Sequence, residues 1–136
     1  MKRNLKLKIN THLRINKELC GSAVSIGDNR SIVECRLTDS MTVDEKGLIH
    51  GGFIFGIADY AAMLAVNHEN VVLASSSCKF LKPSRKEDLI RAEARVTEQQ
   101  GKKFYIEVNI FSNNSITFSG SFMAVIPKNH VLTESQ

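Results

Sequence analysis

His50, two glycines and Asp59 are the residues whose types and spacing could do chemistry. The triplet His50-Gly51-Gly52 precedes an almost wholly apolar segment, Phe53 to Val66, and Asp59 lies in the middle of that segment. An unpaired carboxylate in apolar surroundings costs several kcal/mol, so we expect it to have a role. Burial also raises the pKa of a carboxyl group, which makes it a better base near neutral pH. Asp59 is therefore a candidate general base or nucleophile.

The two glycines suit the close approach of another group to the backbone. Phe53 to Val66 is too long for a typical strand and consists mostly of good helix formers. A helix is predicted there, with His50 to Gly52 as the turn into it. The first N–H groups of a helix have no intrahelical partner, and the helix dipole favours negative charge beside them. The start of this helix is therefore a candidate site for an oxygen that carries negative charge.

Strands are predicted on both sides of this helix in the sequence. Residues 31–38 alternate between apolar and polar side chains, which is typical of a half-buried strand, and residues 71–81 form another strand. Three further alternating segments joined by short turns predict an antiparallel meander: residues 90–97, 104–110 and 116–126. A helix that is apolar on nearly every side must be buried all round. The simplest arrangement is an α+β fold, in which an antiparallel sheet of five to six strands wraps around one long central helix.

Length and composition indicate one globular domain. The chain has 136 residues, of which 43% are hydrophobic and 24% charged, and its net charge is +4. This length is enough for one core and too short for two. We expect a single domain over residues 1–136, with a basic N-terminal arm at 1–14 and a loose C-terminal tail at 128–136. No aromatic residue interleaves the basic residues of the arm, so nucleic-acid binding is not the preferred interpretation.

The sequence carries no pattern typical of a membrane span, a signal peptide or a metal site. No apolar run reaches the roughly 18 residues that a membrane span needs. The N-terminus lacks the long apolar core and the cleavage site of a signal peptide. Cys20, Cys35 and Cys78 are widely spaced without a CxxC pair, so neither a disulfide framework nor a zinc site is predicted. Small buried thiols in a reducing cytoplasm are expected instead.

The stretch from His50 to Asp59 resembles the hotdog-fold acyl-CoA thioesterases, most closely the phenylacetate-pathway type. Residues 16–21 resemble the entry into the first strand of that family, and Phe80 to Pro83 resemble the end of the strand after the helix. The resemblance covers residues 15–127. It implies a six-stranded sheet around one helix and homodimers that could pair into tetramers. It also implies acyl-CoA sites at the dimer interface, with the acyl chain in a tunnel beside the helix.

The same resemblance implies roles for the residues around the helix start. The Gly51 N–H would bind the thioester carbonyl and stabilise an oxyanion, and His50 would orient that loop or the carbonyl. Gly52 and Phe53 are predicted to contact the ligand. Asp59 would act as a general base on water, or attack the thioester directly. A structural role stays open: Asp59 could cap a backbone group or meet a cation across the dimer.

One departure from the family pattern concerns Asp44. Fifteen residues before the helix carboxylate, the family usually carries an Asn whose amide helps to orient water or substrate, and here that position is Asp44. An acceptor thus replaces a donor, and two carboxylates could come near one site. Like charges at close range cannot both ionise comfortably, so one of them would stay protonated. The exchange could preserve a donor, or it could stop hydrolysis.

Three basic residues after the second predicted strand complete the candidate site: Lys82, Arg85 and Lys86. They could meet the phosphates of coenzyme A, although an ordinary solvated turn is an equal alternative. The predicted function is acyl-CoA binding by a cytoplasmic homodimer, with hydrolysis weak or absent because of Asp44. The alternative is an active acyl-CoA thioesterase that uses Asp59 and the Gly51 amide. No cofactor is expected apart from the coenzyme A thioester itself, as ligand or substrate.

Overall fold

The computed structural model describes residues 7–133 and contains six strands and one long helix within that range. The predicted arm residues Lys2, Arg3 and Lys6 and the last three residues of the predicted tail lie outside the described residues. The elements in chain order are α1 (Lys17–Cys20), β1 (Ser22–Gly27), β2 (Arg30–Arg36), the 3-10 turn η1 (Asp39–Met41), α2 (Gly51–Val66), β3 (Val72–Phe80), β4 (Leu89–Gln100), β5 (Lys103–Ser112) and β6 (Ser115–Val125).

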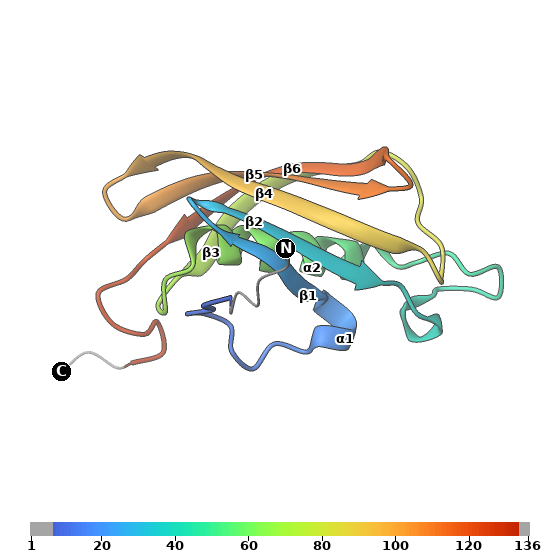
Figure 1. The fold of residues 1–136 in the computed structure, drawn as a ribbon, viewed down its shortest axis with the longest axis horizontal. Coiled ribbons are helices and arrows are strands. Elements are labelled where there is room, and N and C mark those ends of the chain that lie inside the picture. The colour runs from blue at the N-terminus through green and yellow to red at the C-terminus, as the bar shows by residue number, and fades with distance from the viewer. Residues whose placement is uncertain (1–6, 134–136) are drawn as a thin grey trace, which may run out of the picture.

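All six strands form one antiparallel sheet in the order β1-β2-β4-β5-β6-β3. Figure 1 shows this sheet curving over α2, and β4, β5 and β6 form the predicted meander. The side chains of β4 alternate as the sequence predicts, because Ile90, Ala92 and Ala94 face the helix and are buried. The prediction of an antiparallel sheet wrapped around one long helix, the hotdog fold, is confirmed.

The long helix is buried more completely towards its C-terminus than at its start. Nine of its residues are buried, including every residue from Tyr60 to Ala65. In the first half, Gly52 is exposed, and Gly56 and Asp59 are partly exposed. The predicted burial on all sides is therefore complete only from Tyr60 to Ala65 within one chain. No helix in the described part of the chain is long and apolar enough to cross a membrane.

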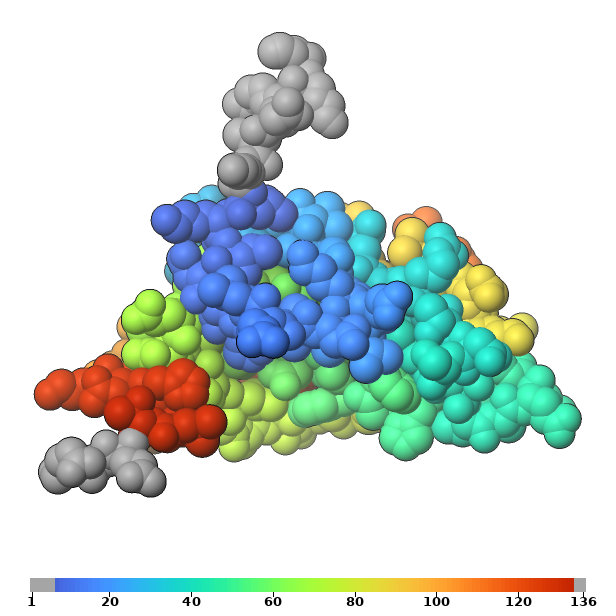
Figure 2. Space-filling view, turned by 90° about the horizontal axis from the view of Figure 1, so that it is seen from below, coloured from blue at the N-terminus to red at the C-terminus, as the bar shows by residue number. Residues whose placement is uncertain are grey.

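Residues 7–21 cross α2 on the side away from the sheet, and we call this segment the strap. Seen from that side, the blue strap lies over part of the green helix (Figure 2). Asn67, which ends α2 with φ 56°, holds the strap by its side-chain amide. Its Oδ1 accepts the N–H of Asn10 at 2.9 Å, and its Nδ2 donates to the carbonyl of Lys8 at 2.9 Å. The strap is therefore attached to the C-terminal end of α2.

The second half of the strap contains the short helix α1. Residues 16–21 were predicted as an entry into the first strand, and they lead into β1 through one helical turn capped by Asn16. Gly21 follows with φ 89°, and a Cβ there would lie 2.6 Å from the carbonyl oxygen of Glu34. Only glycine tolerates both the positive φ and this close approach. The strap is thus fixed against β2 at this end as well.

Candidate functional site

His50 caps the N-terminus of α2. Its Nδ1 accepts the N–H of Gly52 at 2.7 Å, and its own N–H donates to the carbonyl of Met41 at 2.9 Å. The helix therefore begins at Gly51, two residues before the predicted start, and the glycines form its first turn. Because Nδ1 accepts a hydrogen bond, the proton of the neutral ring lies on Nε2. His50 thus orients the loop that leads into the helix. Sequence spacing alone could not show these hydrogen bonds.

The cap leaves no room for a side chain at Gly52. A Cβ at this position would lie 2.8 Å from the Nδ1 of His50 and 2.9 Å from its Cε1. We expect Gly52→Ala to break the cap and to lower the free energy of unfolding by about 1 kcal/mol. Urea denaturation measures this loss. Gly56→Ala is the matched control, since nothing lies within 4 Å of its added Cβ, and it should lose no stability. Equal free energies of unfolding for Gly52→Ala and Gly56→Ala would contradict a stabilising role of the His50 cap.

A cavity of about 320 Å³ opens beside the first turn of α2. It is lined by Ile49, Gly51, Ile54, Phe80, Lys82, Pro83, Ser84 and Thr117. The first-turn position leaves the Gly51 N–H without an intrahelical acceptor. A Cβ on Gly51 would lie 3.4 Å from the Phe80 ring, at ordinary van der Waals distance, so Gly51 lies directly beside this aromatic wall. A backbone donor, an aromatic wall and an ammonium group therefore share one cavity.

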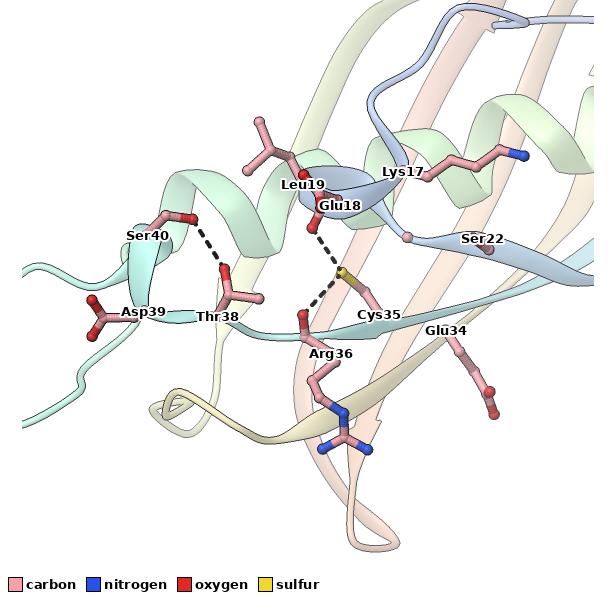
Figure 3. Close-up of a pocket in the computed structure, with 11 residues that line it drawn as sticks. Lys17, Glu18, Leu19, Ser22, Glu34, Cys35, Arg36, Thr38, Asp39 and Ser40 are labelled. Atoms are coloured by element: carbon pink, nitrogen blue, oxygen red, sulfur yellow. Dashed lines mark hydrogen bonds between the residues drawn. The ribbon is translucent and has the colours of Figure 1, made fainter.

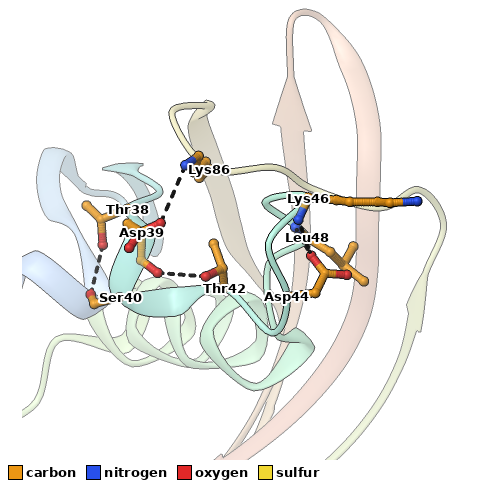
Figure 4. A network of polar contacts seen from close by, with 8 residues as sticks. All are labelled: Thr38, Asp39, Ser40, Thr42, Asp44, Lys46, Leu48 and Lys86. Carbon is orange, nitrogen blue, oxygen red and sulfur yellow. Dashed lines mark hydrogen bonds and ion pairs between the residues drawn. The ribbon is translucent and has the colours of Figure 1, made fainter.

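Only one of the three predicted basic residues lines this cavity. Lys82 does so, and its Nζ donates to the hydroxyl of Ser115. Lys86 forms an ion pair with Asp39 at 3.5 Å, as Figure 4 shows, and Arg85 is exposed in the same turn. Lys86 and Arg85 are not lining residues of this cavity. Within one chain, Lys82 is therefore the basic residue that a ligand beside Gly51 would meet.

Asp44 shapes the loop before α2. Its side chain is exposed, and its Oδ1 accepts the N–H of Lys46 at 3.0 Å and that of Leu48 at 3.2 Å (Figure 4). These bonds close a turn that an asparagine oxygen could close equally well, because both side chains carry an Oδ1 acceptor. The turn itself therefore does not require a carboxylate at position 44.

Asp59 lies in the third turn of α2, partly covered by the strap. Its Oδ1 is buried and has no hydrogen-bond partner among residues 7–133. Burial raises the pKa of Asp59 to about 6. Cys20, the last residue of α1, is a neighbour whose pKa is raised by burial and by the charge of Asp59. Sequence reasoning missed Cys20, because only the packing of α1 on α2 brings the thiol and the carboxyl group together.

A larger cavity, of about 690 Å³, lies between α1, β2 and η1 (Figure 3). Its walls carry charges of both signs, and Cys35 is one of its lining residues. The Cys35 Sγ donates to the carbonyls of Glu18 at 3.8 Å and Arg36 at 3.7 Å, and burial raises the pKa of the thiol to about 11. Such a thiol is a poor nucleophile at neutral pH. None of the predicted site residues lines this cavity.

Comparison with known proteins identifies several sequences that are similar to this chain. The sequence profile described as "Thioesterase superfamily" matches residues 46–118. The chain is 49% identical over 119 residues to methylthioribose-1-phosphate isomerase of Aquifex aeolicus, covering 88% of this chain and 26% of that protein. It is 27% identical over 109 residues to transcription factor FapR of Staphylococcus aureus, covering 78% of this chain and 58% of FapR. The chain thus spans only part of either relative.

Solved structures share most or nearly all of this fold. The uncharacterized protein PH1136 of Pyrococcus horikoshii is 39% identical with a TM-score of 0.92, covering 96% of this chain and 100% of that chain. A hypothetical thioesterase of Streptococcus pneumoniae, solved with coenzyme A, is 19% identical with a TM-score of 0.71, covering 78% of this chain and 84% of that one. The PaaI protein of E. coli is 21% identical with a TM-score of 0.76, covering 84% of each chain. The latter two resemble this chain in fold.

Proposed function

The chain belongs to the thioesterase superfamily, and on that premise we propose that it binds an acyl-CoA or a related acyl thioester as a homodimer, with weak or absent hydrolysis. The cavity at the first turn of α2 carries this proposal. There the Gly51 N–H suits a thioester carbonyl, Phe80 suits an apolar chain and Lys82 suits a phosphate group. The Streptococcus pneumoniae neighbour, which was solved with coenzyme A, supports the ligand class.

The separation of Gly51 and Asp59 supports a dimer. They lie eight residues apart on one helix, which corresponds to about 12 Å along its axis. A single thioester group cannot be within hydrogen-bond reach of both. A second copy could bring its own Asp59 to the Gly51 end of the first. The sheet also ends at β3, whose residues 74–77 are exposed, and a second β3 could pair with this open edge.

Two observations favour binding over turnover. Asp44 presents a carboxylate where an amide donor would help to orient water, and its Oδ1 is already used within its own turn. The relative FapR is a transcription factor, and this chain covers 58% of its length, which is consistent with a regulatory rather than a catalytic role for the domain. We therefore propose that this protein binds its ligand in the cytoplasm and passes the ligand state to a partner.

An active acyl-CoA thioesterase is the second candidate, and Asp59 favours it. Its buried Oδ1 has no hydrogen-bond partner in the described chain, and a pKa of about 6 leaves the carboxylate mostly ionised at neutral pH. In that case Asp59 acts as general base or nucleophile, and the Gly51 N–H stabilises the oxyanion.

A panel of acyl-CoAs separates the two candidates. Acetyl-, octanoyl-, palmitoyl- and phenylacetyl-CoA are each scored for binding by calorimetry and for release of free thiol, and sedimentation measures the oligomeric state. We expect binding of at least one thioester by a dimer or larger assembly, with no thiol release above background. Clear turnover would establish the thioesterase instead. Neither binding nor release would contradict both candidates.

Asp44→Asn tests why hydrolysis is weak. We expect the variant to keep the turn, because its Oδ1 can accept the same N–H groups from Lys46 and Leu48. Its new amide donor and the loss of a negative charge should raise thioester hydrolysis, on the order of 100-fold above the wild type. Thiol release measures this gain, and calorimetry should show unchanged acyl-CoA affinity.

The double variant Asp44→Asn/Asp59→Ala provides the control for that gain. If Asp59 supplies the base, the double variant should bind acyl-CoA and release no thiol above background. A gain that survives the loss of Asp59 would show that hydrolysis does not pass through this carboxylate. If Asp44→Asn alone releases thiol no faster than the wild type, Asp44 does not limit turnover.

A further inference from the structure

A hollow of about 470 Å³ lies beside the start of β3, and we call it the strap hollow. It is lined by residues 11–15 of the strap, by residues 69–72 between α2 and β3, and by His130 and Val131 after β6. Leu13 and Val131 in its wall are 72% and 55% exposed. This apolar surface therefore lacks cover within the described part of the chain.

The proposed dimer would bring this hollow to the cavity at the first turn of α2 in the second copy. Residues 74–77 are the exposed part of β3 that can pair with a second β3. An antiparallel pair centred on this stretch sets Val72 of one copy opposite residues 78–80 of the other. Val72 lines the hollow, and Phe80 and Lys82 line the cavity. The hollow of one copy and the cavity of the other would then adjoin.

The direction of α2 agrees with this arrangement. The proposed dimer brings Asp59 of one copy to Gly51 of the other, so the two helices run in opposite directions. The strap hollow lies at the C-terminal end of α2, where Asn67 holds the strap. That end would lie beside the N-terminal end of the second helix. Phe80 at the cavity and Val131 at the hollow are 54% and 55% exposed, and contact between the copies would cover both.

Coenzyme A carries more negative charge than one chain balances in the cavity. It has a diphosphate and a 3′-phosphate, whereas Lys82 is the one basic residue that lines the cavity among the described residues. The strap hollow adds Arg14, which is exposed and forms no ion pair with any of residues 7–133. A guanidinium group suits phosphate because its N–H groups can contact two oxygens at once.

We infer that the strap hollow of each copy closes the cavity of the other copy, and that Arg14 binds the phosphate groups of the coenzyme A thioester held there. This inference rests on the proposed function and adds the segment and the side chain that the second copy contributes. Each site consists of Gly51 and Lys82 from one copy and Arg14 from the other. Because the phosphates belong to coenzyme A, Arg14 contributes equally to the binding of free coenzyme A and of its thioesters.

Arg14→Gln tests the phosphate contact, with free coenzyme A and octanoyl-CoA as the probes. Calorimetry should show that both bind about tenfold more weakly, because a charge-assisted hydrogen bond is lost in each case. Glu69→Gln should tighten both about threefold, since it removes the one acidic residue that lines the hollow. Lys17→Gln is the matched control: it removes a positive charge from the same strap outside the hollow, and each affinity should change by less than about twofold.

Mixed dimers decide which copy Arg14 serves. Chains with Arg14→Gln and chains with Lys82→Met are produced together with different tags, and the mixed dimer is purified. If each site takes Lys82 from one copy and Arg14 from the other, one site has both residues and the other has neither. Calorimetry with free coenzyme A should then show one site of wild-type affinity and one weakened about 100-fold. Two equally weakened sites would place Arg14 in the site of its own copy and overturn the inference.

Two further results would overturn the inference while the proposed function stands. One is wild-type affinity for free coenzyme A in an Arg14→Gln variant that sedimentation shows to be dimeric. The other is dissociation of the Arg14→Gln dimer, which would show that Arg14 holds the subunits together instead of binding phosphate. A wild-type protein that binds neither octanoyl-CoA nor free coenzyme A would overturn the proposed function and this inference together.

Discussion

Asp59→Asn is expected to stabilise the protein at pH 7.5 by about 3 kcal/mol and to change little at pH 4. The pKa of Asp59 is raised from 3.8 to about 6 in the folded chain because the carboxyl group is buried. Between these two pKa values, the folded state holds a proton that the unfolded state has lost. The stability of the wild type therefore decreases as the pH rises from about 4 to 6, and the loss is complete above pH 6.

Urea denaturation at pH 4 and pH 7.5, at one protein concentration, measures this difference. The amide of Asp59→Asn resembles the protonated acid in shape and does not ionise, so the variant should lack this part of the pH dependence. Asp44→Asn is the matched control: the same exchange on an exposed carboxylate should change the free energy of unfolding by less than about 0.5 kcal/mol. If wild type and Asp59→Asn depend on pH equally, a cation of a second subunit pairs with Asp59, and its role is structural.

Lengthening the acyl chain from butyryl- to octanoyl-CoA is expected to tighten binding about 200-fold. Each methylene moved from water into an apolar path contributes about 0.8 kcal/mol, so four methylenes contribute about 3 kcal/mol. We propose that the acyl chain lies beside α2 against Ile54 and Phe80, which are apolar residues of the cavity at Gly51. Free coenzyme A should bind more weakly than any of these thioesters, because it buries no acyl chain.

Calorimetry with butyryl-, hexanoyl- and octanoyl-CoA gives the gain per methylene. Lys82→Met is the matched control, because it should weaken the binding of all three thioesters and of free coenzyme A by a similar factor. The gain per methylene should stay the same in this variant. Equal rises in melting temperature with free coenzyme A and octanoyl-CoA would mean that no apolar path exists at this position.

The fold follows from patterns that a short stretch of sequence contains. The alternation of Ile90, Ala92 and Ala94 with charged residues places one face of β4 on the core, because side chains of a strand point alternately to its two faces. The apolar run after Gly52 predicts a helix that needs cover, and the sheet supplies most of it. Both conclusions depend only on neighbouring residues and were correct. Residue type and spacing also singled out the helix start and Asp59 as candidates, and their chemical roles stay predictions.

The tertiary structure decided which candidates meet, because distances between segments depend on how loops and helices pack. Residues 16–21 contain a helical turn at the end of the strap, and this turn brings Cys20 near enough to Asp59 for the carboxylate charge to raise the pKa of the thiol. The turn after β3 directs Lys82 to the cavity and Lys86 to Asp39, although both have the same charge and lie four residues apart. The sequence by itself therefore determined the elements and the types of chemical group. Only packing between distant segments decided which of these groups share a cavity.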